Sequence, residues 1–315
     1  MTEMKKEALS SAFSGKILEE GKKDQDIVVV CTDSRGSGKL GAFPAELPEQ
    51  FVEMGIAEQN SVTVSAGLSH TGKKVFCMGP ASFYSMRSAE QVKVDVAYSH
   101  NPVTVIGISG GVSYGALGAT HHSLQDIALM RSIPGITVEI PSDAVQMVKI
   151  TEELLKNPRP AYIRIPRGAV PVIYGEDADI EIGRANVWFD GTDAAIISCG
   201  QLTCYAIEAA RLLEKEGIHI RVVDIHSIKP MDEKAVLEAA EQCGCILTLE
   251  EHSVYGGLGG AVSEIVSERY PVPMLIAGIP DEDVPNGSDL QVFAYYHLDI
   301  EGIADKVRTL MKRKS

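Results

Sequence analysis

Short apolar runs rich in Val and Ile alternate along this chain with longer segments of helical character. Strands buried on both faces have this nearly continuous apolar composition. We predict strands at 26–32, 74–78, 102–109, 136–140, 161–165, 194–200, 218–224, 245–250 and 272–280. We predict helices at 57–70, 83–99, 123–131, 143–156, 202–216, 233–241 and from the glycine-rich turn at 256–260 to 269, with Ser142 as the N-cap of the fourth. This alternation predicts an α/β fold of mostly parallel sheets with helices on both faces.

The alternation is interrupted between residues 167 and 191, where Pro, Gly and acidic residues replace the helical pattern. Such a composition is typical of a linker. A chain of 315 residues is also long enough for two domains. We therefore predict one α/β domain over 1–180 and a second, smaller one over 181–315.

The charge balance excludes several classes of function. The chain has 29 basic and 43 acidic side chains, so its formal charge is −14. A negative surface repels nucleic acids and anionic membranes. The sequence has no apolar run near the ~20 residues that a membrane-spanning helix needs, and its first residues lack the apolar core of a secretory signal. Its six cysteines are scattered, without zinc-site spacing. We expect a cytoplasmic enzyme or enzyme subunit.

Polar residues that could support chemistry follow four of the predicted strands of the first domain. Ligands bind at the carboxyl ends of the strands in open parallel sheets. The four segments are the donor-rich run 32–39, the helix start with Glu58, the loop with His121 and His122, and the strand end with Arg164 and Arg167. Each also has an ordinary explanation. Glu58 could complement a helix dipole, the histidines could be surface residues, and the arginines could form ion pairs.

Taken together and in this order, these segments resemble a known family. The first part of the chain is similar to the pyrimidine-binding domain of transketolase and 1-deoxyxylulose-5-phosphate synthase, and the second to their C-terminal domain. The resemblance spans roughly residues 10–310 and rests on EMGIAEQNSVTVSAGL, SFYSMRSAEQVKVDVA, GALGATHHSLQDIALMRSIPG, YIRIPRG, DIHSIKPMDEKAV and GCILTLEEHSVYGGLGGAVSE.

The resemblance implies thiamine diphosphate as cofactor. A carboxylate matching Glu58 hydrogen-bonds the ring nitrogen of the aminopyrimidine in this family, and so helps to remove the proton from the reactive thiazolium carbon. Tyr84 matches the aromatic residue that packs on the pyrimidine ring, and its neighbour Phe83 takes this place if the register is off by one. Ile56 lies in the apolar flank of Glu58 and is the other cofactor-binding candidate.

The resemblance also implies a substrate site. His121 matches the histidine that contacts the substrate oxygen next to the reacting carbon, with His122 where glutamine is usual. Arg167 matches an arginine that binds the terminal phosphate, and Arg87 matches an anion-contacting arginine in the deoxyxylulose-phosphate relatives. Further candidates for the anion site are Arg35, Arg164 and Lys39.

One position departs from the family pattern. Leu117 occupies the place of an aspartate that contacts a sugar hydroxyl in relatives, so the usual sugar selectivity is in doubt.

The family holds the diphosphate and Mg²⁺ through a Gly-Asp-Gly motif followed by an Asn, and this sequence contains no Gly-Asp-Gly. A full-length transketolase is also about twice as long. The chain therefore resembles the C-terminal half of a split enzyme. We expect the metal ligands on an N-terminal-half partner subunit, and a heterotetramer of two copies of each chain.

Four functions remain open from the sequence. The first is a subunit of a transketolase that transfers a two-carbon ketol unit between sugar phosphates, as in the pentose phosphate pathway. The second is a specialised ketol transferase for a branched, deoxy or sulfonated sugar, which the Leu117 substitution favours. The third is the β subunit of a 2-oxo acid dehydrogenase. The fourth is a regulatory or scaffold subunit, against which the retained Glu58, His121 and Tyr84 argue.

Overall fold

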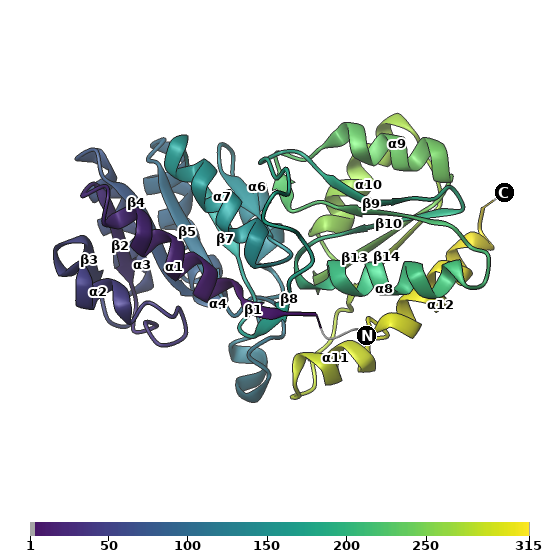
Figure 1. Cartoon of the computed structure of the whole chain (residues 1–315), viewed down its shortest axis with the longest axis horizontal. Helices are drawn as coiled ribbons and strands as arrows, with labels where there is room; N and C mark the ends of the chain where they lie inside the picture. Colours follow the sequence, from purple (N-terminus) through teal and green to yellow (C-terminus); the bar gives the residue numbers. More distant parts are fainter. Residues whose placement is uncertain (1–3, 315) are drawn as a thin grey trace.

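The computed structural model describes residues 4–314, which form two α/β domains lying side by side (Figure 1). The sheet of the first domain has seven strands in the order β12-β6-β7-β5-β4-β2-β3. All are parallel except β12, which is antiparallel to β6 and comes from the second half of the chain. The strands are β2 (Ile27–Cys31), β3 (Phe51–Glu53), β4 (Lys74–Pro80), β5 (Val103–Ile108), β6 (Thr137–Glu139), β7 (Ala161–Arg164) and β12 (Ser227–Lys229).

Helices cover both faces of this sheet because its central strands are apolar on both sides. One face packs on α1 (Leu9–Gly21) and α7 (Ala144–Lys156), with Phe13 against Phe76 at the centre of the core. The other face is covered by α3 (Glu58–His70), the π-helical η2 (Val92–Tyr98) and α6 (Asp126–Ser132). The remaining elements are α2 (Ala42–Glu46), η1 (Pro48–Gln50), α4 (Ala81–Met86), α5 (Ala89–Gln91), η3 (Gly115–Thr120) and the two-stranded ribbon of β1 (Lys6–Ala8) and β8 (Ala169–Pro171).

The second domain has a five-stranded sheet in the order β14-β13-β10-β11-β9, in which only β9 is antiparallel. Its strands are β9 (Asn186–Asp190), β10 (Ala194–Ser198), β11 (Ile220–Asp224), β13 (Ile246–Ser253) and β14 (Met274–Ile279). Its helices are η4 (Gly200–Leu202), α8 (Thr203–Glu214), α9 (Glu233–Cys243), α10 (Leu258–Arg269), α11 (Asp289–Tyr295) and α12 (Ile300–Met311). Helices α8 and α12 pack on one face of the sheet, and α9 and α10 pack on the other.

The predicted α/β fold is confirmed, with three local corrections. The N-cap of α7 is Asp143, whose carboxylate accepts from the Gln146 N–H, whereas the hydroxyl of Ser142 donates to Asp224 at 2.8 Å. The helix predicted over 83–99 is divided into α4, α5 and η2, with a break at Arg87 and Ser88. Residues 167–191 contain β8 and β9 in addition to connecting turns.

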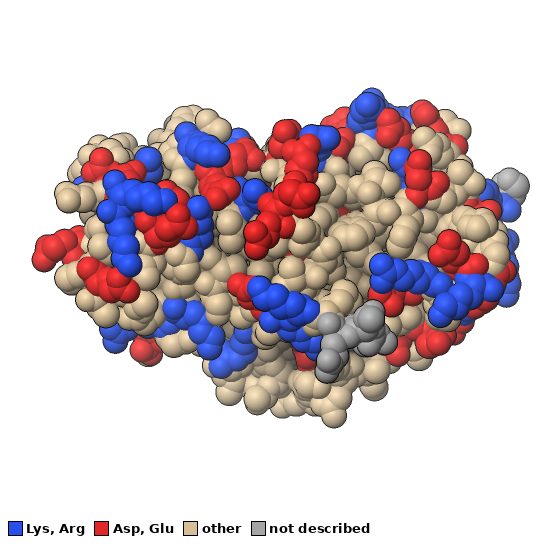
Figure 2. All heavy atoms as spheres, in the orientation of Figure 1, with Lys and Arg blue, Asp and Glu red and all other residues tan. Residues whose placement is uncertain are grey.

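Acidic and basic side chains are interspersed over both domains on the face drawn in Figure 2. This mixed surface agrees with the exclusion of a general polyanion-binding function. No helix among residues 4–314 is long and apolar enough to span a membrane.

Candidate active site

The sequence-predicted candidates lie along one edge of the first sheet, where its parallel strands end. Glu58 follows β3, Phe83 and Arg87 follow β4, His121 follows β5 and Arg167 follows β7. Parallel strands bring their carboxyl ends to the same edge, which is why residues so far apart in the sequence meet here. Figure 1 shows these loops at the lower edge of the sheet.

Glu58 is the first residue of α3, and its side chain is buried. Gly55 takes a positive φ of 63° just before it, and this turn leads the chain from β3 into the helix. The carboxylate is compensated by Arg87, whose Nη1 donates to Glu58 Oε2 at 2.6 Å. Ile56, two residues before Glu58 in the chain, is an apolar side chain with 77% of its surface exposed.

The two aromatic candidates have different surroundings. The ring of Tyr84 is fully buried, and its hydroxyl hydrogen-bonds with Ser61 Oγ at 2.8 Å and with Cys77 Sγ at 3.1 Å. Burial raises the pKa of this phenol well above its ordinary value. Phe83 is only partly buried, and the Arg87 guanidinium lies over its ring at 4.4 Å. The aromatic surface open to a ligand therefore belongs to Phe83.

His121 lies in a loop of residues 110–123, here called the His121 loop, and is held by its neighbours. Its ring meets Phe83 edge-on with centroids 5.1 Å apart, and Tyr114 packs on it at 5.2 Å. The hydroxyl of Thr120 lies 2.9 Å from Nδ1. Because Nδ1 is engaged, Nε2 is the nitrogen left for a ligand.

Arg167 extends this line of contacts to the end of β7. Its guanidinium lies 3.9 Å from the centroid of the Tyr114 ring, and Nη1 donates to Ser37 Oγ at 3.4 Å. The structure thus joins Glu58, Arg87, Phe83, His121, Tyr114, Arg167 and Ser37 in one continuous row of contacts. This row runs from a buried carboxylate at one end to an exposed guanidinium at the other.

Arg35 and Lys39 lie in the loop after β2, as expected, and both are exposed. Arg35 Nε is 3.4 Å from Glu53 Oε2, so part of its charge is already neutralised. Arg35 belongs to the same loop as Ser37, but its side chain contacts Glu53 rather than the row.

His122 and Leu117, the two positions that differ from the family pattern, have different surroundings. His122 is buried, neither of its ring nitrogens has a hydrogen-bond partner among residues 4–314, and burial lowers the pKa of this imidazole. Leu117 is 46% exposed on η3 in the His121 loop. The exposed Leu117 side chain offers an apolar surface without a hydrogen-bond acceptor.

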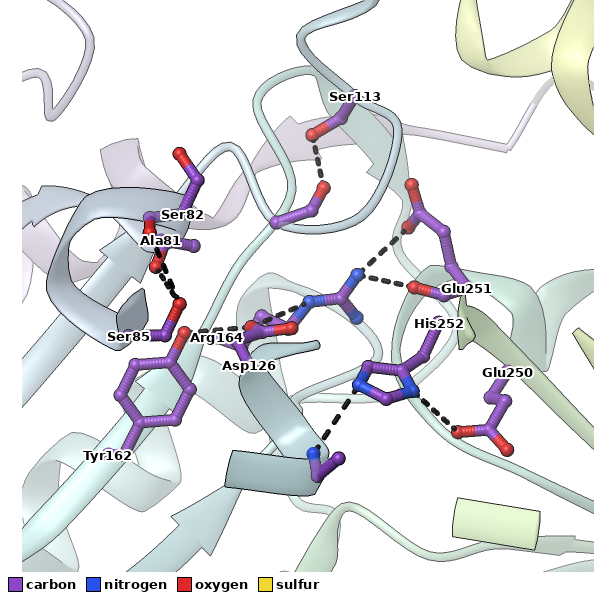
Figure 3. A network of polar contacts seen from close by, with 12 residues as sticks. Ala81, Ser82, Ser85, Ser113, Asp126, Tyr162, Arg164, Glu250, Glu251 and His252 are labelled. Atoms are coloured by element: carbon purple, nitrogen blue, oxygen red, sulfur yellow. Dashed lines mark hydrogen bonds and ion pairs between the residues drawn. The ribbon is translucent and has the colours of Figure 1, made fainter. Parts of the chain in front are cut away.

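The expectation that Arg164 joins the anion site is wrong. Arg164 is buried, with its Nε 3.2 Å from Asp126 Oδ2 and its Nη2 donating to the backbone oxygen of Glu251 at 2.5 Å (Figure 3). Tyr162 donates to the same Asp126 oxygen at 2.8 Å. A buried guanidinium that is ion-paired with Asp126 and bonded to the Glu251 backbone has no surface left for a phosphate. Arg164 instead connects the two domains.

Tyr114 is the site residue that the sequence did not reveal. It joins His121 to Arg167, but it lies in a glycine-rich loop without helical or strand periodicity. The one available signal was an aromatic residue among glycines seven positions before His121.

Comparison with known families identifies both halves of the chain. Residues 5–172 match the family described as "Transketolase, pyrimidine binding domain", and residues 183–303 match "Transketolase, C-terminal domain". The chain belongs to the transketolase family. All of the row from Ser37 to Arg167 lies within the first of these matches.

Individual relatives of the same length are subunits of split transketolases. The chain is 52% identical to an apulose-4-phosphate transketolase subunit of Phocaeicola vulgatus, over 97% of this chain and 98% of the relative. It is 34% identical to a 6-deoxy-6-sulfo-D-fructose transketolase subunit of Clostridium sp., over 87% and 85%. Among solved structures, one titled "Split gene transketolase, inactive beta4 tetramer" is 36% identical, with a TM-score of 0.88 and coverage of 98% and 99%.

Transketolases depend on thiamine diphosphate, and the residues at the Glu58 end of the row fit the aminopyrimidine half of this cofactor. The fit rests on three features: a buried carboxylate at a helix start, the exposed apolar surface of Ile56 and the open ring of Phe83. A ring with hydrogen-bonding nitrogens and two apolar faces needs such partners. Among residues 4–314, no group of three or more His, Cys, Asp and Glu side chains is arranged to hold a metal ion.

Proposed function

We propose that this chain is the pyrimidine-binding subunit of a split transketolase whose donor is a branched ketose phosphate such as apulose 4-phosphate. The observation that carries the proposal is the row of contacts from Glu58 to Arg167. It places a carboxylate suited to the cofactor, an imidazole suited to the reacting region and a guanidinium suited to a terminal anion in one chain of contacts.

When bound, thiamine diphosphate supplies the carbon nucleophile that accepts the two-carbon unit. The residues of this chain bind and orient around it. Glu58 is suited to hydrogen-bond the pyrimidine nitrogen, Phe83 to pack on the ring, and Ile56 to exclude water from it. Mg²⁺ and the diphosphate would be held by a partner subunit that carries the Gly-Asp-Gly motif, in a heterotetramer.

His121 is suited to the proton transfer that accompanies C–C cleavage. In a 2-ketose, the bond between the carbonyl carbon and its neighbouring carbinol carbon breaks, and the hydroxyl on that carbinol carbon loses its proton as it becomes a carbonyl. The Nδ1 atom of His121 is engaged by Thr120, so its Nε2 is the ring nitrogen that can accept that proton and return it in the reverse direction.

Leu117 supports a branched donor. In apulose 4-phosphate the carbinol carbon next to the ketone bears two carbon arms and no hydrogen, so cleavage releases a ketone rather than an aldehyde. The extra carbon arm occupies the place of the hydrogen that an unbranched sugar carries on this carbon, so it needs additional space and contact there. The exposed Leu117 side chain provides such contact, and the 52% identical relative is named for this sugar.

Arg167 and Ser37 would bind the terminal anion, with Arg35 in the same loop as Ser37. A guanidinium binds phosphate and sulfonate oxygens with the same fork geometry. The sulfosugar relative therefore makes a sulfonated ketose the second donor to be tested.

The test is reconstitution of the two-subunit enzyme with thiamine diphosphate and Mg²⁺. Ketol transfer is measured from apulose 4-phosphate, xylulose 5-phosphate and 6-deoxy-6-sulfofructose to an aldose phosphate. We expect the highest kcat/KM with the branched donor, and a loss of about 100-fold or more in Glu58→Gln. Turnover that is undiminished in Glu58→Gln, or that favours another donor, would overturn the corresponding part of the proposal.

A further inference from the structure

The His121 loop begins and ends at a closed base. Gly111 N donates to Ser123 O at 3.0 Å, and Ser123 N donates to Gly111 O at 2.8 Å. Gly111 has a positive φ of 63°, and a Cβ built on it would lie 2.2 Å from the carboxyl carbon of Glu251. The base of the loop is therefore in direct contact with the second domain.

Strand β13 of the second domain holds both sides of this base. On the Gly111 side, Glu251 Oε1 accepts from the backbone N–H of the next residue, Val112, at 2.8 Å. On the Ser123 side, the next residue is Leu124, whose backbone oxygen accepts from the N–H of Ser253 at 3.0 Å. Ser253 lies two residues after Glu251 on the same strand. One strand of the C-terminal domain thus fixes both stems of a loop that belongs to the pyrimidine domain.

Glu251 is itself held from three directions. Gln201 Nε2 donates to its Oε2 at 2.7 Å, and Arg164 lies 3.9 Å from the same oxygen while donating to the Glu251 backbone. Figure 3 shows the Arg164 guanidinium between Glu251 and Asp126, directly below the loop that carries Ser113. A buried carboxylate with this many partners has one position available, so the N–H of Val112 is fixed as well.

The tip of the loop is covered by a second segment of the same domain. A Cβ built on Gly115 would lie 1.6 Å from the backbone oxygen of Gly287, and one built on Gly118 would lie 2.3 Å from Oδ1 of Asn286. Gly118 has φ 66° and ψ −154°, a conformation that glycine alone adopts readily. The tip bearing Leu117 is therefore in close contact with residues 286–287.

We propose that the C-terminal domain positions the His121 loop, with Glu251 as the positioning residue at the base of the loop and the Asn286–Gly287 segment as the one at its tip. The relevance to catalysis rests on the function proposed above. A loop held at base and tip presents His121 and Leu117 to the substrate in one orientation. The C-terminal domain thereby influences sugar binding through the loop.

The first arm of the test does not depend on activity. Hydrogen–deuterium exchange of the full chain is compared between the wild type and Glu251→Ala, Asn286→Ala and Gly115→Ala. We expect faster exchange in peptides from 110–123 in all three variants. Gly15→Ala is the matched control for Gly115→Ala, since a Cβ at Gly15 meets no atom within 4 Å.

The second arm uses the complex reconstituted with the partner subunit. A misplaced loop should raise KM for the sugar phosphate and lower kcat/KM by up to about 100-fold, while the affinity for thiamine diphosphate stays the same. Glu251→Gln should recover most of the loss, because an amide oxygen can still accept from the Val112 N–H. Asn286 is exposed, so its substitution should leave the fold intact.

Unchanged exchange in 110–123 in all three variants, with the fold intact, would overturn the inference. A loss of cofactor affinity equal to the loss of sugar affinity would also overturn it, because the effect would then be general. If the wild-type complex turned over no sugar phosphate, the proposed function would fail, whereas the exchange arm would still decide whether the C-terminal domain holds the loop.

Discussion

Arg87 Nη1 and Glu58 Oε2 lie 2.6 Å apart, and this contact joins a side chain that is 44% exposed to one that is only 4% exposed. The buried carboxylate thus has a charge partner within the chain itself. Arg87 lies in the break between α4 and α5, and its guanidinium reaches the first residue of α3.

Removing this partner should destabilise the chain. In Arg87→Ala the Glu58 carboxylate remains buried without a cation, at a cost of about 1–3 kcal/mol, reduced from the fully buried case by the exposure of Arg87. Urea unfolding of the isolated chain measures this change. The double variant Arg87→Ala/Glu58→Gln should regain stability, since no charge is then left uncompensated. Equal stability of wild type and Arg87→Ala would contradict the prediction.

Phe83 and Tyr84 should separate cofactor binding from stability. Phe83→Leu removes the ring that contacts Arg87 and His121, so the reconstituted enzyme should bind thiamine diphosphate more weakly while its fold is retained. Tyr84→Phe keeps the ring but removes the hydrogen bond to Ser61, which should cost about 1 kcal/mol in unfolding free energy. Cofactor titration and urea unfolding of both variants test this. If only Tyr84→Phe weakened cofactor binding, the prediction would be wrong, and Tyr84 rather than Phe83 would be assigned to pack on the pyrimidine ring.

The comparison of these two neighbours shows how far sequence reasoning reaches. The strands were predictable because runs such as 27–31 are apolar at every position, and the edge on which Glu58, His121 and Arg167 meet follows from parallel topology. The choice between Phe83 and Tyr84 depends on which of two adjacent aromatic side chains of α4 faces the core, and their residue types alone do not decide it.

Partners that lie far apart in the sequence were harder to predict. Arg164 was expected to bind an anion because its type suits that task, but its partners Asp126 and Glu251 lie 38 and 87 positions away in the sequence. Helix α1 was not predicted, although Leu9, Phe13 and Ile17 form its buried stripe at helical spacing. Such contacts are decided by tertiary packing, which one sequence does not display.

Leu117 should govern the choice of donor. In Leu117→Asp the tip of the His121 loop regains a hydroxyl acceptor and loses its apolar surface. We expect the ratio of kcat/KM for xylulose 5-phosphate to that for apulose 4-phosphate to rise on the order of tenfold. Leu117→Ala is the control, because it removes the apolar surface without adding an acceptor. The prediction fails if both variants shift the ratio equally, or if neither does.

Glu251 should make stability depend on pH in the neutral range. Burial raises the pKa of its carboxyl from the ordinary 4.5 to about 7, against the opposing effect of Arg164. The folded chain therefore keeps a proton that the unfolded chain has already released. The resulting stabilisation is complete below about pH 4.5 and is lost as pH rises through 7.

The measurement is the unfolding free energy of wild type minus that of Glu251→Gln, which lacks the titrating group. Between pH 5 and pH 8 this difference should fall by about 3 kcal/mol, as the pKa shift requires. If the unfolding free energies of the two proteins changed with pH in parallel, the pKa of Glu251 would not be raised by folding, and the prediction would be contradicted.

Strand β12, which comes from the second half of the chain, completes the sheet of the first domain by pairing with β6. Without it, β6 would present an unpaired row of backbone donors and acceptors, the kind of edge that recruits strands from other molecules. The chain therefore cannot be divided at residue 180 into two well-behaved pieces. We therefore expect a first domain cut off at residue 180 to expose the β6 edge and to be prone to aggregate.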